Sequence, residues 1–130
     1  MTSNYTAMIL AAGKGKRMLP LTRTIPKPLL KVNGKSLIDY IIENLINANF
    51  SKIVINASHL KESMLDYFKY SEFNKKIVIE IISENQPLET AGGVRNAIDA
   101  IESETFVLVN GDIFTTFNFS SFNSVFKEFK

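Results

Sequence analysis

The chain has 130 residues, of which 45% are hydrophobic and 22% charged, and it contains no cysteine. These values are typical of one globular domain with a real core, and they exclude disulfides, thiolate metal sites and thiol nucleophiles. The apolar runs stay below the roughly 20 residues that a membrane span needs. The N-terminus lacks the basic and then apolar pattern of a leader, so we expect a cytoplasmic protein.

Positive charge is concentrated at one end of the chain. Residues 1–38 hold seven of the 15 Lys and Arg residues and no acid, whereas the remainder holds eight basic and 13 acidic residues. These cations lie in a loop region rather than along a helix interleaved with aromatic residues. They therefore predict a site for a small anion rather than for a nucleic acid.

The first predicted element is a strand over Tyr5–Ala11, which runs directly into two glycines, Gly13 and Gly15. Glycines let backbone N–H groups approach an anion closely. Five cations and no acid follow in the same loop, namely Lys14, Lys16, Arg17, Arg23 and Lys27. The loop is therefore predicted to bind phosphate groups.

Helices and strands alternate after this loop. Apolar residues at helical spacing predict helices over 37–46, 60–68 and 91–101, and Ser36 with Asp39 forms a capping box for the first. Apolar, β-branched runs predict further strands over 52–57, 76–83 and 105–109, buried on both faces. This order favours an α/β, Rossmann-like fold, with a mostly parallel sheet and helices on both faces.

The end of the chain is rich in phenylalanine, with six of the ten Phe residues between Phe114 and Phe129. Phe122, Val125, Phe126 and Phe129 follow the spacing of an amphipathic helix. Such a face needs a cover. We expect the sheet, a second copy or partner chain, or a missing part of the domain to provide it.

Two short motifs resemble nucleotide sites and are rejected. Gly34-Lys35-Ser36 resembles the end of a P-loop, but Leu29 stands where the required earlier glycine should be, so a turn before a capped helix is favoured. The first glycine loop resembles a dinucleotide fingerprint, but Met18 replaces its third glycine and prolines follow. These departures argue against a hydride-transferring Rossmann domain.

Three loops remain, and each follows the carboxyl end of a predicted strand. They span 13–27, 84–93 and 110–112. Ligands of open α/β sheets bind outside these strand ends. The first loop offers cations, the second a carboxylate and amides that suit the edge of a base, and the third a carboxylate that suits a divalent metal.

The chain resembles the N-terminal part of the sugar-1-phosphate nucleotidyltransferases. The resemblance rests on Leu10-Ala11-Ala12-Gly13-Lys14-Gly15-Lys16-Arg17-Met18, on Pro20-Leu21-Thr22 and on Pro26-Lys27-Pro28. The segments 87–93 and 109–113 are most similar to N-acetylmuramate-1-phosphate uridylyltransferases of cell-wall recycling, and also similar to mannose-1-phosphate guanylyltransferases. Many relatives carry Gly where Glu89 stands, which bears on the choice of base and sugar.

The resemblance implies roles for matching residues. Arg17 and Lys27 would be catalytic by neutralising the triphosphate and the departing pyrophosphate, and Asp112 would hold Mg²⁺. Residues implied to bind the nucleotide are Leu10, Ala11, Ala12, Gly13, Gly15, Glu84, Thr90, Gly92 and Asn110, of which Glu84 would contact the base. His59 is expected to be inert.

The implied reaction joins a nucleoside triphosphate, UTP by preference, to a sugar 1-phosphate, N-acetylmuramate 1-phosphate by preference, and releases pyrophosphate. Residues 1–130 would be the nucleotide-binding part, without the family's C-terminal sugar-binding half. A mannose-1-phosphate guanylyltransferase and a non-catalytic nucleotide-binding fragment that needs a partner chain stay open as alternatives. A choline-phosphate cytidylyltransferase shares the first loop, but residues 89–93 favour a sugar substrate.

Overall fold

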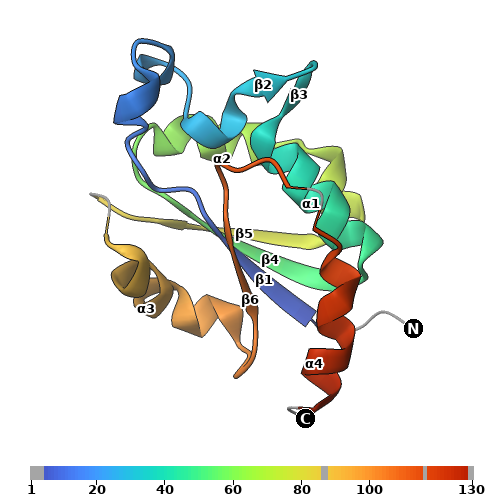
Figure 1. Cartoon of the computed structure of the whole chain (residues 1–130). Coiled ribbons are helices and arrows are strands. Elements are labelled where there is room, and N and C mark those ends of the chain that lie inside the picture. The colour runs from blue at the N-terminus through green and yellow to red at the C-terminus, as the bar shows by residue number, and fades with distance from the viewer. Residues whose placement is uncertain (1–4, 86–87, 116, 129–130) are drawn as a thin grey trace.

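A four-stranded parallel sheet forms the centre of the molecule. The computed structural model describes residues 5–85, 88–115 and 117–128 (Figure 1). The strands are β1 (Tyr5–Leu10), β4 (Phe50–Ala57), β5 (Val78–Ser83) and β6 (Val107–Asn110). Each neighbouring pair in the order β5-β4-β1-β6 is parallel. The predicted α/β fold with a parallel sheet is confirmed.

The strand order reverses beside β1. From β1 the chain proceeds through β4 to β5 on one side, and it then returns to the other side of β1 as β6. All four carboxyl ends meet at one edge of the sheet because the strands are parallel. Open α/β sheets bind ligands at such a reversal point, here between β1 and β6.

Helices cover both faces of the sheet, as predicted. Helices α1 (Leu37–Asn47), α2 (Lys61–Lys69) and α4 (Phe122–Glu128) lie on one face, and α3 (Thr90–Ile101) lies on the other (Figure 1). Successive residues of β1 supply the two cores, because side chains alternate along a strand. Ala7 and Ile9 join the larger cluster, whereas Met8 packs with Ala97 of α3.

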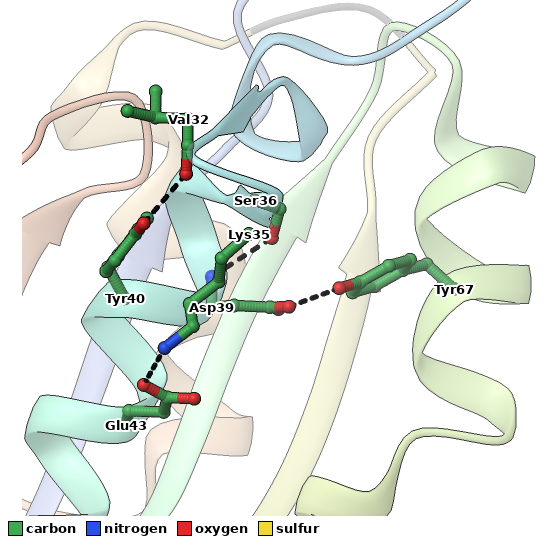
Figure 2. Close-up of polar contacts among 7 residues, drawn as sticks. All are labelled: Val32, Lys35, Ser36, Asp39, Tyr40, Glu43 and Tyr67. Atoms are coloured by element: carbon green, nitrogen blue, oxygen red, sulfur yellow. Dashed lines mark hydrogen bonds and ion pairs between the residues drawn. The ribbon is translucent and has the colours of Figure 1, made fainter.

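The start of α1 is fixed by polar contacts from three elements (Figure 2). Ser36 Oγ accepts a hydrogen bond from the Asp39 N–H at 3.1 Å, which is the N-cap half of the predicted capping box. The Asp39 carboxylate accepts from the Tyr67 hydroxyl of α2. Burial and this hydrogen bond raise the pKa of Tyr67 to about 12. The helix is thereby tied to α2 as well as to its own first turn.

Short elements complete the chain. The strands β2 (Lys31–Val32) and β3 (Lys35–Ser36) form an antiparallel hairpin, which confirms that Gly34-Lys35-Ser36 is no P-loop. The first loop is folded into single 3-10 turns rather than a helix, because its prolines interrupt regular structure. The 3-10 turns in or next to this loop are η1 (Lys16–Met18), η2 (Leu21–Arg23) and η3 (Lys27–Leu29). Two further 3-10 turns, η4 (Glu72–Lys75) and η5 (Phe119–Ser121), lie later in the chain.

The chain itself covers part of its phenylalanine-rich end. Phe126 of α4 is buried, and its ring stacks on Tyr5 of β1 with ring centroids 4.3 Å apart. Phe114 and Phe117 are 60% and 49% exposed, and Phe129 lies outside the described residues. Across the described ranges, no helix combines the length and the apolar character required for a membrane crossing.

Candidate functional site

Two adjoining cavities open at the carboxyl ends of the strands, at the reversal point of the sheet. Their volumes are about 590 and 560 Å³, and both are lined by Leu10, Gly13 and Asp112. Cavities of this size suit small-molecule ligands. The loops after β1 and β6 therefore meet at one hollow, as the sequence predicts.

The first of these, here called the cationic cavity, is strongly positive. Its lining includes four cations and one carboxylate, namely Lys14, Lys16, Arg17, Lys27 and Asp112. Ala11, Gly13 and Gly15 also line it. Fixed cations beside glycine backbone form an environment that stabilises a multiply charged anion.

Lys27 and Asp112 form an ion pair across the cationic cavity. The distance from Lys27 Nζ to Asp112 Oδ2 is 3.0 Å, and the two side chains are 27% and 40% exposed. Lys27 follows β1 by a long loop, whereas Asp112 directly follows β6. A ligand that carried both negative charge and a metal cation could engage each partner separately.

A set of contacts holds the glycine loop in its conformation. Gly15 has a φ of +64°, which favours glycine, and an added Cβ would lie 2.7 Å from Thr22 Cγ2. The Thr22 hydroxyl is fully buried and donates to the Gly15 carbonyl at 2.6 Å. His59 Nε2 lies 2.7 Å from the Thr22 carbonyl, which can only accept, so that nitrogen is the donor. His59 thus supports the loop, which the sequence did not indicate.

The second cavity has a different electrostatic character. Among the described residues, its lining contains the carboxylates of Glu89 and Asp112 but no Lys or Arg. The start of α3 forms one wall through Thr90, and Asn110 of β6 forms another. The two cavities together can hold a ligand that is anionic at one end and neutral and polar at the other.

Glu84 and Gly92 differ from the other predicted site residues because they line neither cavity. Glu84 is 3% exposed, and its Oε1 accepts a hydrogen bond from Asn56 Nδ2 at 3.0 Å. Gly92 packs beside Leu88, since an added Cβ would lie 3.2 Å from Leu88 Cβ. In this structure Asn56, rather than Glu84, forms the cavity wall.

Sequence reasoning missed Asn56, Leu88 and Ala91 in the wall of the second cavity. Leu88 and Ala91 are apolar residues within a loop already selected, and no chemical signal distinguishes them. Asn56 could have been found, because an amide at the end of a buried apolar strand must have a partner.

The acidic residues offer limited metal-binding capacity. The described residues contain no group of three or more His, Asp or Glu side chains that could hold a metal ion. Asp112 is one half-exposed carboxylate that lines both cavities. This donor set fits Mg²⁺, which binds to one or two carboxylates and completes its shell with water and phosphate oxygens.

Comparisons with known proteins agree with this geometry. A family model described as nucleotidyl transferase matches residues 6–130. The chain is 41% identical over 122 residues to N-acetylmuramate alpha-1-phosphate uridylyltransferase of Neisseria meningitidis serogroup B, covering 88% of this chain and 50% of that protein. It is 33% identical over 114 residues to mannose-1-phosphate guanyltransferase of Saccharomyces cerevisiae, covering 86% of this chain and 32% of that protein.

A solved structure has the same fold. UDP-glucose pyrophosphorylase complexed with UDP-glucose matches with a TM-score of 0.81 at 25% identity, covering 98% of this chain and 55% of that chain. The chain therefore spans about half the length, or less, of the proteins it matches.

Proposed function

The chain belongs to the nucleotidyl transferase family, and we propose that it is the nucleotide-binding half of an enzyme that makes nucleotide sugars. One observation carries the proposal. The loops after β1 and β6 and the start of α3 line one hollow, and all the basic residues of its lining lie in the cationic cavity. The reaction would join a nucleoside triphosphate to a sugar 1-phosphate and release pyrophosphate.

The charge distribution orients the nucleotide. The triphosphate occupies the cationic cavity, with Arg17 and Lys27 against its phosphate oxygens. The nucleoside occupies the second cavity, between Thr90 at the start of α3 and Asn110 of β6. Leu10 and Gly13 line both cavities, so they lie beside the junction of nucleoside and phosphates.

The chemistry is transfer of a nucleotidyl group. An oxygen of the sugar 1-phosphate attacks the α-phosphorus, the bond from that phosphorus to the bridging oxygen breaks, and pyrophosphate leaves with its electrons. The attacking phosphate is already an anion at neutral pH, so the reaction needs no general base. Positioning and charge neutralisation supply the catalysis.

Asp112 would hold the magnesium ion, which would neutralise charge on the phosphates. Lys27 pairs with this carboxylate at 3.0 Å in the structure. On binding, Lys27 exchanges the carboxylate for phosphate oxygens, so that its charge opposes the charge growing on pyrophosphate. Substrate binding would therefore separate the ion pair, with Asp112 bound to magnesium and Lys27 bound to phosphate.

For the substrates we propose UTP and N-acetylmuramate 1-phosphate. The relative from Neisseria meningitidis, an N-acetylmuramate alpha-1-phosphate uridylyltransferase, supports this choice at 41% identity. GTP with mannose 1-phosphate is the alternative, supported by the yeast relative at 33% identity. Glu89 lines the second cavity, where its carboxylate would face the base or the sugar.

The test is a two-stage assay of the full chain. A thermal-shift panel of the four ribonucleoside triphosphates with magnesium should show stabilisation, greatest with UTP, because a ligand that binds the native state stabilises it. Pyrophosphate release is then measured with UTP, magnesium and N-acetylmuramate 1-phosphate. Stabilisation by none of the four nucleotides would contradict the proposal.

A fragment that depends on a second chain is the alternative function. The exposure of Phe114 and Phe117, at 60% and 49%, favours it. A second copy or a partner chain would then cover this surface and complete the sugar pocket. Nucleotide binding without pyrophosphate release, together with a dimer mass in solution, would support that alternative.

A further inference from the structure

Asn56 is a buried polar residue to which the proposed reaction gives no role. It lies at the carboxyl end of β4, opposite Leu10 of β1, and is 2% exposed. The same residue lines the second cavity. A buried amide is retained where its hydrogen bonds are satisfied, so its partners indicate what it does.

The first partner is the backbone of the anion-binding loop. Asn56 Oδ1 accepts a hydrogen bond from the Ala11 N–H at 2.6 Å. The other side of the same peptide group is also held, because the Leu10 carbonyl accepts from the Gly111 N–H at 2.8 Å. The peptide between β1 and the glycine loop is therefore fixed from both neighbouring strands. It sets the direction in which the chain enters the cationic cavity.

The second partner is Glu84. Asn56 Nδ2 donates to Glu84 Oε1 at 3.0 Å, and the Glu84 N–H donates to the Ala57 carbonyl at 2.7 Å. An ionised carboxylate can only accept, so Glu84 fixes the orientation of the amide, with its oxygen toward Ala11. Glu84 Oε2 has no hydrogen-bond partner among the described residues. Within that part of the chain, Asn56 is therefore the side chain that donates a hydrogen bond to the Glu84 carboxylate.

Helix α3 closes over this pair. A Cβ added to Gly93 would lie 2.9 Å from Asn56 Nδ2 and 3.5 Å from Glu84 Oε1. Only glycine permits so close an approach of the helix. The two side chains are thus almost fully buried, at 2% and 3% exposure, and their hydrogen bond is largely shielded from water.

We propose that Asn56, oriented by Glu84, is a positioning residue that holds the Leu10–Ala11 peptide and thereby the glycine loop in its anion-binding conformation. The proposal rests on the proposed function for the identity of the anion, a nucleoside triphosphate. It gives Glu84 an indirect role, through Asn56, in place of the direct contact with the base that the family resemblance implies. The order of contacts is Ala11 N–H to Asn56 Oδ1, then Asn56 Nδ2 to Glu84 Oε1.

The test is a cycle of isosteric variants of the full chain. Asn56→Asp keeps an acceptor for Ala11 but places a second carboxylate against Glu84, and two adjacent carboxylates repel. Adding Glu84→Gln again places a donor opposite an acceptor, with the direction of this hydrogen bond reversed and with the net charge of the unaltered chain. Glu84→Gln alone keeps the contact, because its amide oxygen can accept from Asn56.

Two readouts are measured, with all variants at the same pH. The first is hydrogen exchange in the nucleotide-free chain, comparing the Ala11–Gly15 amides with those of α1. We expect Asn56→Asp to raise loop exchange by about tenfold or more, with α1 unchanged, and the double variant and Glu84→Gln to resemble the unaltered chain. The second is UTP affinity with magnesium, which should weaken and recover in the same pattern.

The outcomes separate the two proposals. Loop exchange that is unchanged in Asn56→Asp, rises equally in α1, or is not restored in the double variant overturns the positioning role. An Asn56→Asp chain that fails to fold while the double variant folds supports the role, and failure of both overturns it. If exchange follows the cycle but the unaltered chain binds no nucleotide, the positioning role stands and the proposed function fails.

Discussion

The ion pair of Lys27 and Asp112 is the residue-scale feature with the clearest chemical consequence. Lys27→Ala should reduce kcat/KM for pyrophosphate release by about 100-fold or more, about 3 kcal/mol of transition-state stabilisation, by analogy with loss of one preorganised donor. The measurement is steady-state release with UTP and the sugar 1-phosphate. Free energy of unfolding should change little, because a half-exposed pair contributes little to stability.

Lys75→Ala is the matched control for that variant. Lys75 also pairs with a carboxylate, Glu72, at 2.8 Å, but on an exposed 3-10 turn rather than in the cavity. Its removal should leave release unchanged. Equal losses in the two variants would indicate a general effect of charge and would contradict a specific role for Lys27.

Gly15 is the second residue whose replacement has a defined outcome. Gly15→Ala combines a φ of +64° with a Cβ that would lie 2.7 Å from Thr22 Cγ2, and the buried Thr22 cannot move away. We expect a loss of about 1–3 kcal/mol in the free energy of unfolding, and weaker UTP binding because the loop is displaced. Denaturant unfolding and isothermal titration measure the two effects.

Gly34→Ala is the control that distinguishes the effect of backbone strain at a positive φ from the effect of displacing the glycine loop. Gly34 also has a positive φ, +81°, but no atom lies within 4 Å of an added Cβ. It belongs to the hairpin turn and lines neither cavity. This variant should lose stability through backbone strain alone and bind UTP normally. If Gly34→Ala also weakened UTP binding, the loss of affinity in Gly15→Ala would have to be attributed to general backbone strain rather than to displacement of the glycine loop.

At the scale of elements, the contact between α1 and α2 predicts that the free energy of unfolding decreases at alkaline pH. The pKa of Tyr67 is raised from 10.0 to about 12 by burial and by its hydrogen bond to Asp39. The folded state therefore holds a proton that the unfolded state loses between these values. The resulting stability is fully present below pH 10 and is lost as pH rises toward about 12.

Tyr67→Phe tests this dependence. The variant should be less stable than the unaltered chain at neutral pH, because it leaves Asp39 without this donor, and the difference should shrink between pH 10 and about 12. Urea unfolding at several pH values measures it. Tyr70→Phe, at an 82% exposed position, is the control and should show no such change. A constant difference between Tyr67→Phe and the unaltered chain would contradict the assignment.

The elements were predictable where local pattern and tertiary contact agree. The strand β1 reads as a continuous apolar run because Met8 and Ile9 face different cores. The hairpin around Gly34 was missed as a pair of strands because each strand has only two residues. At α1 the predicted cap of Ser36 forms, but Asp39 contacts Tyr67, which lies 28 residues away and which local sequence cannot indicate.

The site was predictable in position more than in contacts. The loops containing Arg17 and Asp112 meet because the carboxyl ends of parallel strands share one edge. The sequence could not show that Glu84 lies behind Asn56, since that depends on how closely Gly93 brings α3 to the sheet. Strand-end position follows from topology, whereas the depth of a side chain follows from packing between elements.

At the scale of the whole molecule, the uneven distribution of charge predicts how binding depends on salt. Residues 1–38 carry seven cations and no acid, and four of these cations line the cationic cavity. Added salt screens partly exposed charges, with a Debye length that falls from about 10 Å at 0.1 M to about 3 Å at 1 M. At constant magnesium, affinity for UTP should therefore fall several-fold over this range, as measured by titration calorimetry.

Two comparisons separate local contact from the long-range field. Uridine carries no phosphate, so its affinity should hardly respond to salt. Lys31→Glu reverses a charge that is exposed on β2 and does not line the cationic cavity. It should slow UTP association at low salt and have no effect at high salt, because steering is a long-range effect that salt removes. UTP affinity that is insensitive to salt would mean that the cations do not hold the phosphates, and it would contradict the proposed orientation of the nucleotide.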